Sequence, residues 1–302
     1  PDWSRGLGDV YKRQDVNKIT LGYWSTKGLG SASRQMIIYA GVPLIAKIYK
    51  VLPKEENNQI IYEGSSWHDN DKIDLKKKNS LINLPYLKYF KDDKEFIISH
   101  SNTCLTFLGK EFGMFGETQE EEIECEQLLQ ETVDLRSIVT RFAYTHFNSK
   151  DEELLAAKEV YNTAFENSNS GKLQKFEHWL SSKDKSKTKL FLVGNKISSP
   201  DFNLFDTLDL YCEFLLYYNF VEHADKNNVF AVLEYPLISD FFNNFKQLPK
   251  MQKYFESELY KLPFTNKGAK FGSGKSGITW NPSIDTDTTV SYTHLRAHET
   301  NQ

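Results

Sequence analysis

The sequence predicts an α/β domain followed by an all-helical domain. Short β-branched and aromatic segments alternate with helical patterns in the first third of the chain, which is the order of elements in an α/β fold. After Gly116, long amphipathic helical patterns dominate. Because the change falls at residues 113–118, we expect a linker there, between an α/β domain of residues 15–112 and an all-helical domain of residues 119–289.

The α/β prediction begins with a β-strand, a helix and a second strand. Lys18–Trp24 (KITLGYW) is β-branched and aromatic, which is typical of a strand. Ser33–Tyr39 has helical character, and Gly41 and Pro43 end that helix. Leu44–Lys50 alternates like a second strand. These three elements predict a βαβ opening.

The rest of this domain is predicted to contain a loop, a hairpin and a helix. Pro53–Ser66 is polar and is expected to be a loop. Tyr86–Phe90 and Glu95–Ile98 are separated by the turn-like sequence KDDK and predict a β-hairpin. Ser99–Gly113 then predicts a helix that ends at its glycine.

The second domain is expected to consist of helices. Glu120–Phe147 and Asp151–Leu180 carry the longest helical patterns. Lys189–Val193 has a strand-like composition but is short, and no segment after Thr118 firmly predicts a strand. Ser198–Asp201 (SSPD) has the form of a capping box, with a hydroxyl at the N-cap and a carboxylate three residues later. Phe202–Tyr218 is apolar on nearly every side, which predicts a buried helix.

The two ends of the chain share a relation that folding does not require. Asp9–Gln14 has the sequence DVYKRQ, which the DNA string GATGTGTATAAGAGACAG would encode. The reverse complement of that string, translated from its third base, gives VSYTH, which is the sequence of Val290–His294. The pair resembles a translated sequencing adaptor, so we exclude residues 1–14 and 290–302 from the fold prediction as artefacts.

Composition and charge exclude several classes of protein. Hydrophobic residues make up 39% of the chain and aromatic residues 14%, which is enough for a sizeable core and does not fit a disordered chain. A formal net charge of −4 does not favour nucleic acid or an anionic membrane as partner, and no apolar run has the length of a membrane span. The cysteines lack metal-ligand spacing and suit a reducing cytoplasm; they are Cys104, Cys125 and Cys212.

Tyr23 is the main candidate for chemistry. It ends the first predicted strand just before the first predicted helix, which is where open α/β sheets bind ligands. Position alone does not separate a functional tyrosine from one in the core or on the surface, since the chain contains 16 tyrosines.

Short motifs follow Tyr23 in order along nearly the whole chain, and their order and spacing matter more than any one of them. They are LGYW at Leu21–Trp24 with Gly28-Leu29, NLPYL at Asn83–Leu87, SHSN at Ser99–Asn102, GET at Gly116–Thr118, GNK at Gly194–Lys196, and the Ser198/Asp201 cap. Together they resemble the cytosolic glutathione transferases, and specifically the mu class.

This resemblance implies a thioredoxin-like glutathione-binding domain followed by an all-helical domain, in a cytoplasmic homodimer that serves detoxification. It implies transfer of an alkyl or aryl group to the sulfur of glutathione, which acts as co-substrate with no further cofactor. The electrophile is implied to be a small hydrophobic molecule.

In such an enzyme Tyr23 has a physical role. A thiol has a pKa of about 8.5, so that little of it is thiolate at neutral pH. A phenol hydroxyl that donates a hydrogen bond to the sulfur stabilises the anion over the thiol. A hydrogen bond to a charged group contributes about 1.5–3 kcal/mol, which lowers the pKa of the thiol by about one to two units.

The resemblance also implies the anchors of the tripeptide. Pro85 matches the cis-proline that presents main-chain groups to the cysteinyl part. Ser101 matches the hydroxyl that holds the γ-glutamyl carboxylate at a helix N-terminus. Trp67 and Lys72 match residues at the glycyl end, with the spacing of Lys72 shifted, and Asp134 matches an acid that reaches into the partner subunit's site. The full implied glutathione set is Trp24, Leu29, Trp67, Lys72, Asn83, Leu84, Pro85, His100, Ser101 and Asp134.

The electrophile site is expected in an apolar cleft between the domains. Trp24 and Leu29 match one of its walls, and Tyr144 matches a second tyrosine that can bond some electrophiles or leaving groups. The chain departs from the mu pattern at Gly64–Ser66, where an arginine is common, and at Leu81, where an aromatic subunit key is common. His100 stands in place of a glutamine.

Two alternatives on the same fold stay open at this point. One is a non-catalytic carrier of apolar ligands, and the other is an isomerase that uses glutathione. Tyr23 favours an enzyme over a carrier, since a carrier has no need of a group that stabilises a thiolate. The sequence does not separate conjugation from isomerisation, nor does it name the electrophile.

Overall fold

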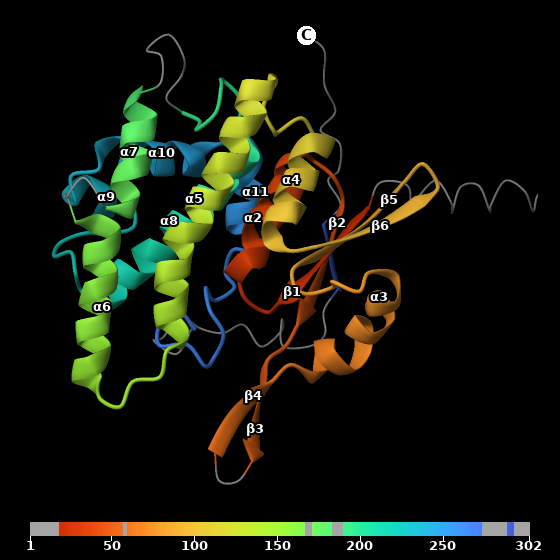
Figure 1. Cartoon of the computed structure of the whole chain (residues 1–302), viewed down its shortest axis with the longest axis horizontal. Coiled ribbons are helices and arrows are strands. Elements are labelled where there is room, and N and C mark those ends of the chain that lie inside the picture. The colour runs from red at the N-terminus through yellow and green to blue at the C-terminus, as the bar shows by residue number, and fades with distance from the viewer. Residues whose placement is uncertain (1–17, 57–58, 167–170, 183–189, 274–288, 293–302) are drawn as a thin grey trace, which may run out of the picture.

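The computed structural model describes residues 18–56, 59–166, 171–182, 190–273 and 289–292 and is built on a five-stranded sheet (Figure 1). Its strand order is β6–β5–β1–β2–β7, in which β1 and β2 are parallel and the other pairings are antiparallel. The predicted βαβ opening and hairpin are therefore confirmed. The strands are β1 (Ile19–Trp24), β2 (Leu44–Tyr49), β5 (Tyr86–Lys91), β6 (Lys94–Ser99) and β7 (Thr289–Tyr292).

The two faces of the sheet pack against different layers, because side chains alternate along β1. Ile19 and Leu21 join the main core, together with α2 (Ser31–Tyr39) and α4 (Ser101–Glu111), on the side of the helical half (Figure 1). The opposite face carries a smaller core beside η2 (Trp67–Asp71) and α3 (Lys72–Lys78). Its buried residues are Tyr49, Trp67, Ile82 and Tyr86.

The helical half is arranged around α8 (Ser199–Tyr217), in which every residue from Ser199 to Leu215 is buried. This confirms the expected buried helix. Its position in the middle of the half (Figure 1) leaves it no solvent face, so its polar residues need partners inside the protein. The other helices are α5 (Gln119–Tyr144), α6 (Lys150–Phe165), α7 (Lys172–Ser182), α9 (Val229–Val232), α10 (Pro236–Gln247) and α11 (Gln252–Glu256), with short turns η1 (Gly28–Gly30) and η3 (Pro249–Met251).

Two local predictions are wrong. The expected polar loop at Pro53–Ser66 holds an antiparallel pair, β3 (Leu52–Glu56) and β4 (Gln59–Glu63), which projects from the body as an arm (Figure 1). Ile60, Ile61 and Tyr62 of β4 are residue types enriched in strands, but the polar residues around them dominated the prediction. The pattern at Asp151–Leu180 is two helices, because α6 ends before an Asn- and Ser-rich stretch typical of turns. At Lys189–Val193, for which no strand was firmly expected, the described part forms turns and bends.

The chain ends differ in what the structure describes. Residues 1–14 lie outside the described residues, whereas β7 (Thr289–Tyr292), which overlaps the predicted artefact from Val290 on, pairs with β2. An edge strand presents unpaired amides and carbonyls that accept another segment through its backbone, largely without regard to sequence. Pairing of this kind does not decide the origin of residues 290–302, so the adaptor interpretation stays a prediction.

The predicted capping box is present at the start of α8. The carboxylate of Asp201 accepts hydrogen bonds from the amide and hydroxyl of Ser198 at 2.7 and 2.8 Å. Its other oxygen accepts from the amide of Leu192 at 2.8 Å. A single buried carboxylate therefore fixes both the helix start and the preceding loop.

We expect Asp201→Ala to lower the free energy of unfolding by about 2–3 kcal/mol, because three buried donors lose a charged acceptor. Urea unfolding measures the change. Asp240→Ala is the matched control, since Asp240 is exposed on α10, and it should change stability by less than about 0.5 kcal/mol. Equal effects of the two substitutions would contradict the structural importance of the cap.

Candidate active site

Several predicted residues meet at one end of the sheet. Tyr86 of β5 pairs with the residue before Tyr23, so that Pro85 and Tyr23 lie at the same end. Tyr86 also pairs with Ser99 of β6, and Ser101 then begins α4. The carboxyl end of β1 is thus bordered by the cis-proline turn and by a helix N-terminus, an arrangement suited to binding a ligand with a carboxylate.

Tyr23 is buried, and its hydroxyl accepts a hydrogen bond of 3.0 Å from the amide of Leu29. Because the hydroxyl acts as acceptor in this bond, its own proton is available for a second bond. Burial raises the pKa of Tyr23 above 10.0, while the Leu29 amide and the charges of Arg136 and Arg34 oppose that shift. The side chain is therefore a neutral hydrogen-bond donor throughout the physiological range.

The turn beside Tyr23 requires glycine. Gly28 has a φ of +40°, and a β-carbon there would lie 2.6 Å from the Tyr23 hydroxyl oxygen. A β-carbon on Gly30 would lie 2.7 Å from the Tyr23 ring. The backbone can therefore approach the tyrosine closely enough for the Leu29 bond only because both flanking residues lack side chains.

Buried ion pairs hold the same turn from the helical half. Lys27 pairs with Asp209 at 2.8 Å. Arg136 pairs with Asp206 at 2.8 Å and donates to the carbonyl of Gly28 at 2.9 Å. Sequence reasoning missed these residues, although a signal existed: two aspartates in a helix predicted to be buried need cationic partners.

Further contacts tie the turn to its own domain and to the chain segment after α11. Arg34 donates to the carbonyls of Thr26 and Trp24 at 2.8 and 3.3 Å. The amides of Lys27 and Gly28 donate to consecutive carbonyls, those of Pro263 and Phe264, at 2.8 and 3.2 Å. The turn is thus held on several sides.

The Leu84–Pro85 peptide bond is cis, as expected. Asn83, which precedes it, is fixed by Ser99: the Asn83 amide donates to the Ser99 hydroxyl at 2.9 Å, and that hydroxyl donates back at 3.0 Å. Ser99 belongs to the SHSN motif, but the sequence assigned it no role, and its contact with Asn83 shows only in the structure. His100 has a φ of +72° and is exposed at the start of α4.

The region predicted to bind the glycyl end contains Lys72, whose spacing from Trp67 is shifted from the mu pattern. Trp67–Asp71 is a wide turn with a kink at Asn70, and the amide of Lys72 donates to the carbonyl of Trp67, five residues back. The wider turn absorbs one extra residue, which accounts for the altered spacing between Trp67 and Lys72. The Lys72 ammonium lies 3.4 Å from the His68 ring nitrogen, so both reach the same surface.

Trp67 itself is fully buried, and its ring stacks on Tyr86 with centroids 5.6 Å apart. Its indole nitrogen has no hydrogen-bond partner among the described residues. A buried donor without an acceptor costs about 1–3 kcal/mol. An acceptor from a ligand would remove that cost.

The predicted electrophile residues come from both halves of the molecule: Trp24 and Leu29 border the Tyr23 turn, and Tyr144 belongs to α5. Leu29 is 42% exposed and Trp24 is half-buried, with its ring 6.0 Å from that of His68. The Tyr144 hydroxyl donates to the side chain of Asn266 at 3.2 Å and accepts from its amide at 3.1 Å. Tyr144 is therefore already bonded twice to the segment after α11.

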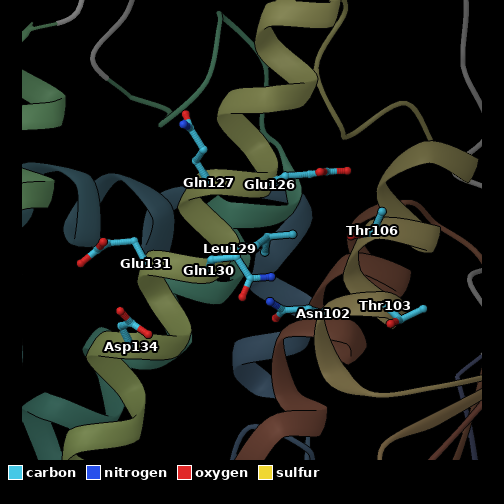
Figure 2. Close-up of a pocket in the computed structure, with 9 residues that line it drawn as sticks. All are labelled: Asn102, Thr103, Thr106, Glu126, Gln127, Leu129, Gln130, Glu131 and Asp134. Atoms are coloured by element: carbon cyan, nitrogen blue, oxygen red, sulfur yellow. The ribbon is translucent and has the colours of Figure 1, made fainter. Parts of the chain in front are cut away.

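Asp134 lines a different feature, an open groove of about 720 Å³ between α4 and α5 (Figure 2). Its carboxylate is 63% exposed and lies 3.4 Å from the ammonium of Lys172 in the same chain. The structure thus groups most of the predicted glutathione residues at the Tyr23 end of the sheet and leaves Asp134 on the surface of α5.

Comparison with known proteins agrees with this geometry. The sequence model for "Glutathione S-transferase, C-terminal domain" matches residues 133–258. Human glutathione S-transferase Mu 3 is 26% identical over 261 residues, which cover 85% of this chain and 96% of that protein. The class-mu 26 kDa isozyme of Schistosoma mansoni is 27% identical over 255 residues, covering 84% and 96%.

The chain is a mu-like glutathione transferase. The solved structure of the glutathione S-transferase Blo t 8 shares its fold, with a TM-score of 0.63 and 18% identity, over 84% of this chain and 99% of that one. The predicted fold, an α/β domain of thioredoxin-like type followed by helices, is therefore confirmed.

The described part of this transferase offers no group of three metal-ligating side chains, and none of its helices is long and apolar enough to cross a membrane. The three cysteines are buried free thiols. Burial raises the pKa of Cys104 and of Cys125 to about 12, so neither thiol is a nucleophile at neutral pH.

The raised pKa of Tyr23 predicts an alkaline effect on the stability of the transferase. Above pH 10 the unfolded chain loses the phenol proton while the folded chain retains it, so the free energy of unfolding falls with pH. Tyr23→Phe removes this contribution and should give a shallower fall, by up to about 1.4 kcal/mol per pH unit. Urea unfolding of both proteins between about pH 9 and pH 11 measures the slopes. Parallel slopes would show that the pKa of Tyr23 is not raised.

Proposed function

We propose that this transferase joins the thiolate of glutathione to small hydrophobic electrophiles and that the Tyr23 hydroxyl stabilises the thiolate. The observation that supports this most is the Leu29 bond, in which the hydroxyl accepts and keeps its proton for the sulfur. The relatives named above are glutathione transferases, which favours conjugation over ligand carriage and isomerisation.

The chemistry needs few groups. Glutathione binds as a thiol and loses its proton to solvent, and the Tyr23 hydroxyl donates a hydrogen bond to the sulfur anion. The sulfur then forms a bond to the electrophilic carbon, and the leaving group departs with its electron pair. A bond to a charged acceptor contributes about 1.5–3 kcal/mol, enough to make thiolate a substantial species at pH 7.

The tripeptide is proposed to lie along the end of the sheet. The main chain at Leu84 and Pro85 faces the cysteinyl part, beside Asn83. Ser101, at the start of α4, takes the γ-glutamyl carboxylate with His100 beside it. Supporting this placement is the helix N-terminus, which favours an anion.

The glycyl end is proposed to meet Trp67 and Lys72. The unpartnered indole donor of Trp67 supports the assignment, because a buried donor calls for an acceptor. The Lys72 ammonium supplies a charge for the carboxylate, next to His68. Gly64–Ser66 supplies no arginine, so the contact that such a residue makes to this carboxylate is absent from the proposed set.

The electrophile is proposed to bind against Trp24 and Leu29, with Tyr144 at the far side. A cytoplasmic homodimer is proposed as the working form, in which Asp134 reaches the γ-glutamyl amine in the partner's site. The exposure of Asp134 at an open groove on α4 and α5 supports an intermolecular contact there (Figure 2). Leu81, 71% exposed, is available for the same contact.

Tyr23→Phe should lower kcat/KM for a chloronitrobenzene by about 10- to 100-fold at pH 7, because the thiolate loses its donor. Glutathione affinity, measured by calorimetry, should change by less than about threefold. Tyr39→Phe is the control, since Tyr39 ends α2 and has no role in the proposed site. Equal rates for wild type and Tyr23→Phe in a protein that binds glutathione would refute the role of Tyr23.

Trp67→Phe should raise KM for glutathione by about three- to tenfold with little change in kcat, because it removes an indole donor and keeps an aromatic ring. Trp179→Phe is the matched control: its indole donates to the Leu192 carbonyl at 2.8 Å. That substitution should lower the melting temperature and leave KM unchanged. If Trp67→Phe leaves KM unchanged as well, the indole does not bind glutathione.

A further inference from the structure

Arg136 links the helical half of the molecule to the turn beside Tyr23. One nitrogen of its guanidinium donates to Asp206 at 2.8 Å and to the Thr207 hydroxyl at 3.3 Å. The other donates to the Gly28 carbonyl at 2.9 Å. The planar guanidinium carries donors on two separate nitrogens, so a lysine, with one nitrogen, is not an equivalent replacement.

The Gly28 carbonyl belongs to the peptide segment that contacts the Tyr23 hydroxyl. Gly28 packs so closely on Tyr23 that a β-carbon would lie 2.6 Å from the phenol oxygen. The next residue, Leu29, donates its amide to that oxygen at 3.0 Å. Arg136 therefore holds the peptide segment that orients the Tyr23 hydroxyl.

The guanidinium also places charge in this buried region. Arg136 is only 6% exposed, so its field is weakly screened. Its charge acts on Tyr23 from α5, together with Arg34 of α2 and Asp206 of α8, and it acts on Tyr144 of its own helix. Because its effect on Tyr23 exceeds that of Asp206, the ion pair as a whole favours an anion at this position.

We propose that Arg136 is a positioning residue for the transfer reaction: held by Asp206, it fixes the Gly28–Leu29 turn and provides the positive charge that makes the thiol of bound glutathione more acidic. This inference rests on the proposed function. It adds a contribution from the helical half to the stabilisation of the thiolate, in addition to the hydrogen bond from Tyr23.

The test measures two midpoints. The first is the pKa of the bound thiol, from ultraviolet titration of glutathione thiolate on the protein. The second is the midpoint of the acid limb of the pH profile of kcat/KM with a chloronitrobenzene. Arg136→Gln should raise both midpoints by about one pH unit. Arg136→Lys keeps a charge and should raise them by less than half as much. Arg141→Gln is the matched control, an exposed arginine of the same helix, and should leave both unchanged.

Asp206→Asn separates electrostatics from general disruption. It removes the carboxylate that opposes the anion, so the midpoints should move down or stay, whereas Arg136→Gln moves them up. If Arg136→Gln does not fold because it leaves Asp206 buried and unpaired, the double variant Arg136→Gln/Asp206→Asn takes its place. The midpoints of the double variant should rise by less than about one pH unit. It loses the effect of Arg136, which favours the anion, together with the smaller opposing effect of Asp206.

Three results would overturn the proposal. The first is unchanged midpoints in folded Arg136→Gln or, where that variant does not fold, in the double variant. The others are equal shifts in the Gln and Lys variants, and a rise in Asp206→Asn as large as that in Arg136→Gln. Failure of the proposed function looks different. A wild-type protein that binds glutathione and lowers its thiol pKa, yet conjugates no electrophile, would refute conjugation and leave the role of Arg136 intact.

Discussion

The hydrogen bond from the Leu29 amide to the Tyr23 hydroxyl determines how the rest of the site is built. It directs the phenol so that its proton faces away from the turn, and it is formed only because Gly28 and Gly30 let the backbone touch the ring. A turn this tight, with a positive φ and almost no side chains, has little packing of its own. It must be fixed by contacts from elsewhere in the chain.

Two of those contacts, through Lys27 and Arg136, depend on α8. Asp206 and Asp209 lie three residues apart and hence on one face of the helix, where they meet Arg136 and Lys27. Asp201, at the start of the same helix, fixes the helix start and the preceding loop. One buried helix therefore connects the stability of the helical half to the geometry of a turn in the other half.

Local patterns predicted the elements that depend on local physics. Strand, helix and cap signals around Tyr23 and Ser198 sufficed for the fold, and the order of motifs pointed to Pro85 and Ser101. What the sequence did not contain is information carried by distant partners: Ser99 is recognisable only once β6 lies beside the cis-proline turn, and Arg136 only once α5 lies beside α8. The arm of β3 and β4 was missed although Ile60, Ile61 and Tyr62 are strand-forming residue types, because the segment as a whole is polar.

The buried ion pairs cost stability, since each charge leaves water and an apolar pair of similar volume would be no less stable. The ion pairs contribute to the proposed reaction instead. Dipoles and charges fixed during folding need no reorganisation when the sulfur becomes an anion, whereas water would have to reorient. Lys27 illustrates the cost: burial lowers the pKa of its ammonium, and the carboxylate of Asp209 opposes that shift and keeps the charge in place. The buried charges on α8 thus lower stability, but they fix the turn beside Tyr23 before a ligand binds.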